Sequence, residues 1–159
     1  MKKRIIFLTI LSIILIPQTN AQGYNAEKTV LTNFLIRMYE NAPFEGVRAV
    51  DDYEQQYLIS VLTLEKAKYP SESAMFRVAE VKAMSQASRF FNGSSITSEL
   101  IIRTSEKSDG SGDTEMIETI NEKSVGFVRA LELLTNFDLD NGRMVFIYFT
   151  PIKSKTAKE

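Results

Sequence analysis

The side chains that perform most enzyme chemistry are missing from this sequence of 159 residues, which contains no His and no Cys. Without imidazole there is no Ser-His-Asp triad and no histidine ligand for a metal. Without a thiol there is no cysteine nucleophile, zinc ribbon, iron–sulfur cluster or disulfide. The chemistry that remains is that of carboxylate pairs, Ser–Lys dyads and metal sites built from oxygen ligands.

Glu80 is one candidate for carboxylate chemistry. On a helix it falls between Phe76 and Ala83, at the edge of an apolar stripe, where a shielded carboxylic acid can serve as a general acid. A glycoside hydrolase needs a second carboxylate roughly 5 to 9 Å away across a cleft, and the sequence does not identify that partner. We therefore expect Glu80 to reach water or to pair with Arg77.

Lys82 and Ser85 are three residues apart, the spacing of a Ser-x-x-Lys motif. In that motif, however, the serine comes first and lies at the start of a helix, where it can act as the nucleophile. Here the order is reversed, so we expect no nucleophile at this position.

The segment from Asp138 to Gly142 contains oxygen ligands like those of a calcium-binding loop. If Asn136 is position 1 of such a loop, position 6 is Asn141 in place of Gly, and position 12 is Ile147 in place of the bidentate Glu. A hairpin turn accounts for the same residues. We accordingly predict no catalytic residue, no cofactor site and no metal site.

The N-terminus has the pattern of a secretory signal peptide. Three basic residues, Lys2 to Arg4, precede an apolar run from Ile5 to Ile16, and Thr19-Asn20-Ala21 supplies small residues for a signal peptidase. We expect cleavage between Ala21 and Gln22. An uncleaved membrane anchor is the alternative, although twelve apolar residues fall short of the about 20 that a spanning helix needs. Because the chain has no Cys, an N-terminal lipid anchor is excluded.

Cleavage would leave a mildly acidic mature chain. Removing the three basic residues of the leader leaves 16 basic and 20 acidic residues, a net charge of −4. This charge disfavours binding to nucleic acid, where contacts between Lys or Arg and phosphate dominate the affinity. An exported chain without disulfides fits a bacterial envelope, so we expect it in the periplasm or associated with the outer surface.

The mature chain is expected to form a single domain over residues 22–152, followed by a disordered tail over 153–159. Apolar periodicity and turn residues predict three helices and five strands. The helices are expected at 25–41, 71–91 and 114–123, and the strands at 46–50, 53–64, 95–104, 127–138 and 143–151. This order predicts an α+β two-layer sandwich, in which a mostly antiparallel sheet of four to five strands carries the helices on one face.

Specific residues define several of these elements. Ser71 or Ser73 is expected to cap the second helix, whose buried face consists of Phe76, Ala79, Ala83, Ala87 and Phe90. Asp51-Asp52 is expected as a turn, and Asp140-Asn141-Gly142 as a hairpin turn. In the strand over 95–104, alternation places Ile96, Leu100 and Ile102 on one face. The strand over 143–151 is apolar on both faces and should lie inside the sheet.

The order of these pieces between Ser71 and Pro151 also carries a resemblance. The alanine helix leads into Asn92 to Glu99, a short helix precedes Ser124 to Val128, and the final hairpin contains Asp138, Asn141 and Gly142. This half of the chain is similar to the LPP-twenty lipoprotein family and to the N-terminal domain of flagellar assembly protein T. The resemblance implies a non-enzymatic envelope module that supports assembly. Two departures are the missing anchoring Cys and Phe137, which stands where a Trp is expected.

The sequence therefore favours an exported, non-catalytic bacterial envelope protein that acts as an interaction or assembly module. Its expected partner is an envelope protein rather than nucleic acid, and no integral membrane segment is expected after cleavage. Two alternatives remain open. One is a small carboxylate-dependent hydrolase of envelope glycan. The other is a carrier of lipid or small molecules, with its cavity between helix and sheet against Phe76, Phe90 and Phe91.

Overall fold

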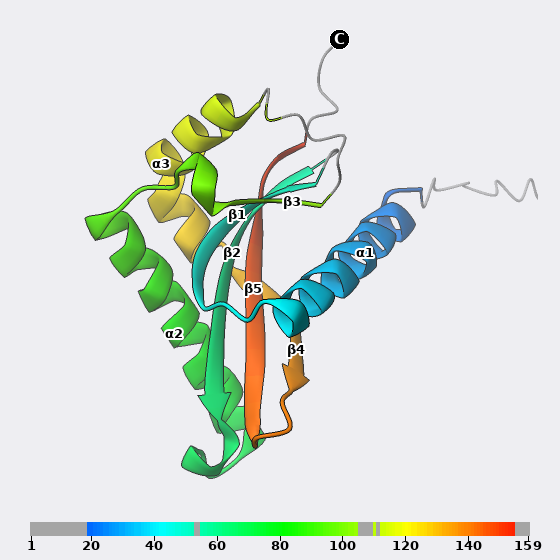
Figure 1. Ribbon diagram of the computed structural model, residues 1–159, viewed down its shortest axis with the longest axis vertical. Helices are drawn as coiled ribbons and strands as arrows, with labels where there is room; N and C mark the ends of the chain where they lie inside the picture. Colours follow the sequence, from blue (N-terminus) through cyan, green and yellow to red (C-terminus); the bar gives the residue numbers. More distant parts are fainter. Residues whose placement is uncertain (1–18, 53–54, 105–109, 111, 155–159) are drawn as a thin grey trace, which may run out of the picture.

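The computed structural model describes residues 19–52, 55–104, 110 and 112–154, which form three α-helices and a five-stranded sheet (Figure 1). The predicted leader up to residue 18 and residues 155–159 of the predicted tail lie outside this range. The elements are, in chain order, α1 (Thr19–Asn41), β1 (Gly46–Asp52), β2 (Gln55–Glu65), α2 (Glu72–Gly93), β3 (Ile101–Arg103), α3 (Asp113–Arg129), β4 (Glu132–Asp138) and β5 (Arg143–Ser154). Short 3-10 turns follow β2 and precede β3.

The strands lie in the order β3-β1-β2-β5-β4. Every neighbouring pair is antiparallel except β1 and β3, which run parallel. The long strands β2 and β5 pair along most of their length in the middle of the sheet, which confirms the interior position predicted for the strand over 143–151. The α+β sandwich predicted from the sequence is thus the observed architecture.

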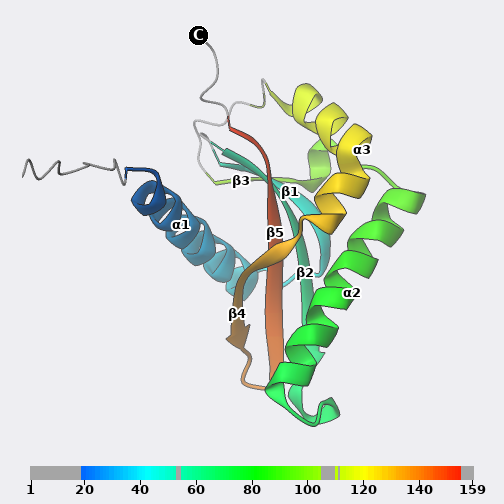
Figure 2. The ribbon, with the colours of Figure 1, turned by 180° about the vertical axis from the view of Figure 1, so that it is seen from behind.

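The two faces of the sheet are covered by different helices. On one face, α2 and α3 pack over Leu58, Leu62 and Phe146. On the other, α1 buries Leu31, Leu35 and Tyr39 against a second apolar cluster of the sheet that includes Ile59, Val61, Val145, Ile147 and Phe149. Figures 1 and 2 show α1 separated from α2 and α3 by the sheet. The expectation that all helices share one face therefore needs correction, because a central sheet that is apolar on both faces requires cover on both.

Helix α2 begins as its sequence predicts, but its buried face consists of Met75 and the three alanines, while Phe76 and Phe90 are only partly buried. The Ser71 hydroxyl accepts a hydrogen bond from the Ala74 N–H at 3.2 Å, so Ser71, and not Ser73, is the N-cap. Ala79, Ala83 and Ala87 are fully buried, and these small side chains let the helix axis approach the sheet closely. The helix continues to Gly93, two residues beyond the predicted end at 91, and Ser94 is extended.

The segment between α2 and β4 differs most from the prediction. The strand expected over 95–104 shortens to Ile101–Arg103, and Ile96 is held by a hydrogen bond from its N–H to Asn121 Oδ1 at 3.2 Å. Ile96 therefore packs on the α2 side, whereas Ile102 packs on the α1 side, and the predicted shared face is wrong. Helix α3 extends to Arg129 because Phe127 and Val128 reach the core as helix residues.

Two predicted boundaries near turns also change. Asp51 and Asp52 are the last residues of β1 instead of a turn. The β4–β5 hairpin turn is confirmed, since the Leu139 N–H donates to the Arg143 carbonyl at 2.8 Å and Gly142 has a φ of +73°. Strand β5 runs on to Ser154, two residues beyond the predicted end of the domain.

Candidate functional site

Strand β2 is longer than its neighbour β1, and this leaves part of the edge of β2 unpaired. Strand β1 begins at Gly46, opposite Val61, whereas β2 continues to Glu65. Leu62 to Glu65 are therefore paired with β5 on one side and have no β1 residue on the other. This stretch borders a hollow of about 400 Å³, which we call the edge groove. It is lined by Glu45, Leu62, Thr63, Leu64, Lys82, Ser85, Gln86 and Arg89.

Gly46 lies at the position where the chain from α1 joins the sheet. Its φ of +120° is a conformation that residues with a Cβ rarely adopt, so glycine suits this junction. The preceding residues, Ala42 to Glu45, are not part of the sheet. As a result, β1 pairs with β2 only between Val61 and Gln55. The end of β2 that leads to α2, Leu62 to Glu65, stays open on this side.

The main chain of Thr63 faces this open side. Hydrogen-bonding groups of a strand alternate between its two neighbours, and the Lys66 N–H, which donates to the Gly142 carbonyl at 3.1 Å, faces β5. Thr63, three residues earlier, therefore presents its N–H and C=O to the side away from β5. In the described part of the chain, the structure gives these two groups no hydrogen bond. The Thr63 side chain lies on the face of the sheet that α1 covers, and its hydroxyl oxygen is 3.1 Å from the Tyr39 hydroxyl oxygen.

Helix α2 forms one wall of the edge groove. Lys82, Ser85, Gln86 and Arg89 follow one another at spacings of three, one and three residues, which places them on one helix face. Gln86 is anchored to the sheet, since its Nε2 donates to Ser60 Oγ and to the Val61 carbonyl, each at 3.0 Å. The wall therefore has a fixed position relative to the β2 edge.

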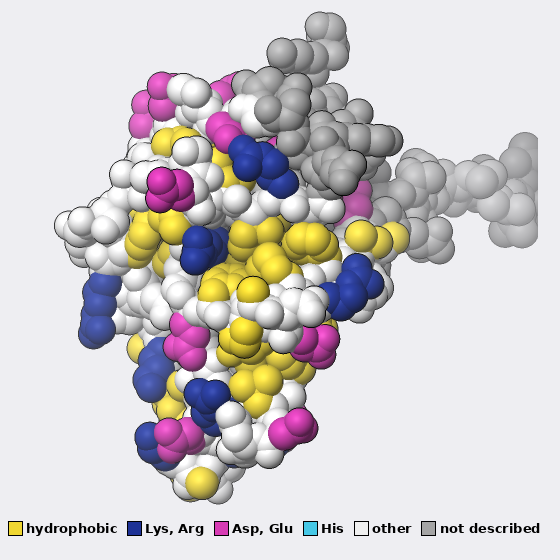
Figure 3. Space-filling model, viewed as in Figure 1, with side chains coloured by type: hydrophobic (Ala, Val, Ile, Leu, Met, Phe, Trp, Pro, Cys, Tyr) yellow, Lys and Arg dark blue, Asp and Glu magenta, His cyan; other side chains and the backbone are white. Residues whose placement is uncertain are grey.

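The charges of this wall are available for a ligand. Lys82 and Arg89 are exposed, and neither forms an ion pair with another residue in the ranges that the structure describes. Glu45 is the one acidic residue that lines the groove. Figure 3 shows Lys and Arg side chains along the α2 side of the molecule, beside hydrophobic side chains exposed in the middle of the view. The groove thus has two cationic side chains next to an open strand edge.

The reversed Lys–Ser pair of the sequence lies in this groove. The structure brings Lys82 and Ser85 to the same wall, but no hydrogen bond joins them in the described part of the chain. A serine nucleophile requires a base within hydrogen-bonding reach and a third group that orients the base. The geometry therefore supports a binding role for these two side chains.

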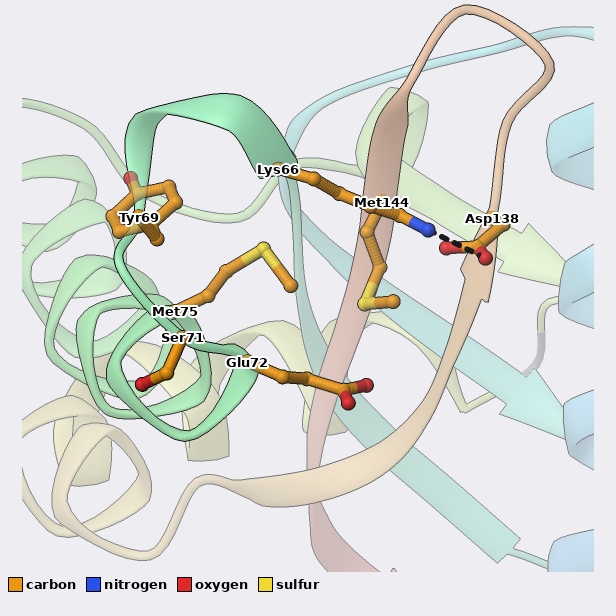
Figure 4. A pocket seen from close by; sticks show the side chains of 7 residues that line it. All are labelled: Lys66, Tyr69, Ser71, Glu72, Met75, Asp138 and Met144. Carbon is orange, nitrogen blue, oxygen red and sulfur yellow. Dashed lines mark ion pairs between the residues drawn. The ribbon is translucent and has the colours of Figure 1, made fainter.

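A second hollow, of about 430 Å³, lies where β2 and the β4–β5 hairpin end. It is lined by Lys66, Tyr69, Ser71, Glu72, Met75, Asp138 and Met144. Figure 4 shows the side chains of Met75 and Met144 between the Lys66–Asp138 ion pair and Glu72. The ion pair is 2.7 Å long, and its side chains are 41% and 58% exposed, so it contributes about 0–1 kcal/mol. Because Ser71 already caps α2 and Lys66 is paired, we interpret this hollow as a structural junction.

The hairpin residues that resembled a calcium loop are engaged elsewhere. Asp138 pairs with Lys66, and Asn141 Oδ1 accepts hydrogen bonds from both the N–H and the Nε of Arg143 at 3.2 Å. Among the residues described, no group of three or more acidic side chains could hold a metal ion. The oxygen atoms of this segment therefore stabilise the turn.

A polar cluster at the opposite end of the sheet was not found from the sequence. Arg103 of β3 forms an ion pair with Asp113 at the start of α3, and the Thr104 hydroxyl donates to Asp52 Oδ1 at 2.5 Å. Asp51 is only 2% exposed. The sequence pattern of two aspartates indicated a solvated turn, and only the parallel pairing of β1 with β3 reveals that they join three elements.

The residues of the two alternative functions are placed as follows. Glu80 is exposed on α2. Its charge acts on a buried tyrosine: burial, together with the nearby Glu80 carboxylate, raises the pKa of Tyr148 from 10.0 to about 12. Phe76 packs edge-on against Phe146 with ring centroids 5.2 Å apart, and Phe90 packs on Phe91 in the same way. A general acid requires shielding that Glu80 lacks, and the aromatic face occupies space that a carrier would need.

Comparisons of the chain with protein-family models, curated proteins and solved structures found no match. No helix in residues 19–52, 55–104, 110 and 112–154 combines the length and the apolar character that a membrane span requires. Function in such a fold is determined by the geometry and chemistry of its site.

Proposed function

We propose that this chain is an exported bacterial envelope protein that acts by binding another protein, without catalysis, through the edge groove. The observation that carries the proposal is the unpaired edge of β2 from Leu62 to Glu65, which borders a groove with exposed cationic side chains. An open strand edge is a template for pairing with another chain, and proteins use such edges for recognition.

The two outer edges of the sheet give a useful contrast. Strand β3 has only three residues, and β4 carries a register shift between Leu133 and Thr135. Short edge strands and bulges are the devices by which proteins prevent edge-to-edge pairing. No bulge interrupts Leu62 to Glu65, where regular pairing with β5 continues. This difference supports a binding role for the edge of β2.

Export is supported by the N-terminal sequence and is compatible with the packing of α1. The basic residues and the apolar run match a signal peptide. Leu31, Leu35 and Tyr39, the buried residues of α1 in the part of the chain that the structure describes, follow the proposed cleavage position between Ala21 and Gln22. Removal of the leader therefore leaves the contact between α1 and the sheet intact. The resemblance to envelope modules between Ser71 and Pro151 points to the same location.

Site-directed photo-cross-linking in cells tests the proposal. A photoreactive amino acid is placed at Ser85 in the groove, and in a matched variant at the exposed Lys123 of α3. We expect a discrete cross-linked product from Ser85 in the envelope fraction, identifiable by mass spectrometry, and a much weaker one from Lys123. If neither Ser85 nor any of a set of other exposed positions gives a reproducible product, the binding function is contradicted.

A further inference from the structure

We propose, on the premise of the protein-binding function above, that the partner contributes an extended acidic segment that pairs with β2 as an added strand. The segment would extend the sheet where β1 stops, with its acidic side chains toward Lys82 and Arg89. The occupant is thus a peptide segment in β conformation that carries acidic residues at alternate positions.

The main chain supplies the first part of the argument. Thr63 offers one donor and one acceptor to the open side, and Glu65, two residues on, faces the same way. At the end of the open stretch that adjoins β1, Gln86 Nε2 donates to the Val61 carbonyl at 3.0 Å, as the N–H of a neighbouring strand would. The vacant stretch therefore starts immediately after Val61. Four residues of strand, Leu62 to Glu65, span roughly 13 Å, which is enough for a short added strand.

The charges supply the second part. Lys82 and Arg89 are two turns apart, or about 10.5 Å along the helix axis. Side chains on one face of a strand recur at about 6.7 Å intervals, so alternate acidic residues of the ligand fall within reach of both cations. Both cations lack an ion pair in the described part of the chain, and Glu45 is the one acidic residue among those that line the groove, while Glu65 at the end of the stretch is paired with Lys68. An acidic segment is therefore favoured over a basic one.

The opposite face of the added strand has a different environment. There Tyr39 packs on Phe44 with ring centroids 6.3 Å apart, and Phe44 is only partly buried. Because side chains alternate between the two faces of a strand, the residues between the acidic ones would be apolar. The complete pattern of the ligand is thus apolar and acidic residues in alternation.

Titration with short peptides tests this inference. The probe is the peptide acetyl-Val-Glu-Val-Glu-Val-amide, and the matched controls carry Lys or Gln in place of both Glu residues. Binding is followed by NMR on the mature chain labelled with ¹⁵N. We expect the Glu peptide to shift the amide signals of Thr63 and Glu65, and to bind at least about tenfold more tightly than the Lys peptide, a ratio of Kd values.

Charge-reversal variants provide the second arm. In K82E/R89E both substitutions lie at exposed positions, so the fold should persist, and we expect the Glu peptide to lose about tenfold or more in affinity. The variant K123E on α3 changes a charge away from the groove and should bind as the unaltered chain does. Equal affinity for the three peptides, amide shifts that map outside the groove, or an unchanged Kd in K82E/R89E would overturn the inference.

The outcomes also separate this inference from the proposed function. If cross-linking identifies a partner but the acidic peptide does not bind beside Thr63, the binding function stands and the strand-pairing inference fails. A second copy of the chain is the competing occupant. Sedimentation that shows concentration-dependent dimers, lost in K82E/R89E, would reject the peptide in favour of self-association.

Discussion

Gln86 is the residue that connects the fold to the edge groove. Its side chain bridges α2 to two groups of β2, Ser60 Oγ and the Val61 carbonyl, and the Ser60 hydroxyl in turn donates to the Ala83 carbonyl at 3.2 Å. These bonds hold the cationic wall at a fixed distance from the open edge. One partly buried polar contact therefore serves both the stability of the helix–sheet interface and the shape of the site.

Replacing Gln86 by Met should lower the free energy of unfolding by about 1–3 kcal/mol, because Val61 and Ser60 lose hydrogen-bond donors in a shielded place. Urea unfolding followed by circular dichroism measures the change. The control, S85A, removes a half-buried hydroxyl one residue away for which the described part of the chain shows no hydrogen bond, and should change stability by less than about 0.5 kcal/mol. Equal effects in the two variants would show that the Gln86 bridge does not stabilise the fold.

Tyr148 gives a pH-dependent prediction. Because burial and Glu80 raise its pKa from 10.0 to about 12, the folded chain keeps the phenol protonated where the unfolded chain ionises it. The stabilisation is complete below pH 10 and is lost as the pH rises toward 12. Stability measured between pH 9 and 11.5 should thus fall more steeply in the unaltered chain than in Y148F.

An absorbance titration provides the direct check. The difference between the unaltered chain and Y148F at 295 nm should contain one tyrosine that ionises near pH 12. In E80Q the same transition should occur at lower pH, because the carboxylate that opposes ionisation is gone. A Tyr148 transition near pH 10 would contradict this account of its surroundings.

At the scale of elements, caps and turns determine where helices and strands end. Ser71 starts α2 by accepting the Ala74 N–H, and Gly142 closes the β4–β5 hairpin with a positive φ. Both features lie at the same end of the sheet, where Lys66 and Asp138 join β2 to the hairpin. Local sequence signals therefore fix this end of the molecule.

The substitution S71A should destabilise the chain by about 1 kcal/mol, because α2 loses the side chain that satisfies an N-terminal N–H. S73A is a matched control, since Ser73 is exposed and only accepts a 3.4 Å hydrogen bond from Arg77. The shift in the denaturant midpoint, compared between variants whose m-values are equal, measures the change in stability of both variants. A larger loss of stability in S73A than in S71A would show that Ser71 is not the N-cap of α2.

Two glycine substitutions should act in opposite directions. G142A forces a residue with a Cβ to a φ of +73° and should cost about 1–2 kcal/mol. G126A lies inside α3, where an added Cβ meets nothing within 4 Å, and should stabilise by about 0.4–1 kcal/mol. Thermal unfolding of both variants checks the signs. A destabilising G126A would show that the α3 backbone is not helical at that position.

At the scale of the whole molecule, the sheet is a layer with helices on both sides. Helix α1 covers the face formed by Val145, Ile147 and Phe149, while α2 and α3 cover the other. The proposed cleavage between Ala21 and Gln22 removes the first residues of α1, and it leaves Leu31, Leu35 and Tyr39, which pack on the sheet, in place. The arrangement also leaves the end of β2 free for a partner.

Export makes a simple prediction about mass. The chain recovered from the envelope fraction should begin at Gln22, with an intact mass that corresponds to residues 22–159. When produced without the leader, the same residues should fold with the near-ultraviolet circular dichroism spectrum of the exported chain, because Leu31, Leu35 and Tyr39, which pack α1 on the sheet, all remain. A recovered chain that begins at Met1 would contradict the signal-peptide interpretation.

The sequence by itself determined the local structure and the fold class. Apolar periodicity located α1, α2 and the long strands, the alanine stripe identified the buried face of α2, and the Asp-Asn-Gly turn located the final hairpin. Such signals act between residues that are close along the chain, so one sequence contains them. The short β3 and the long α3 were missed because contacts such as that between Ile96 and Asn121 override local alternation.

Only the tertiary structure decided which face each helix covers and where the candidate site lies. Thr63, Lys82 and Arg89 come from elements whose relative placement no spacing rule predicts, and the Lys–Ser pair looked unimportant as a catalytic motif. The groove exists because β1 starts opposite Val61 while β2 continues to Glu65. That mismatch is a property of pairing between strands, since the unpaired N–H and C=O groups are present in every residue and only their missing neighbour makes them a site.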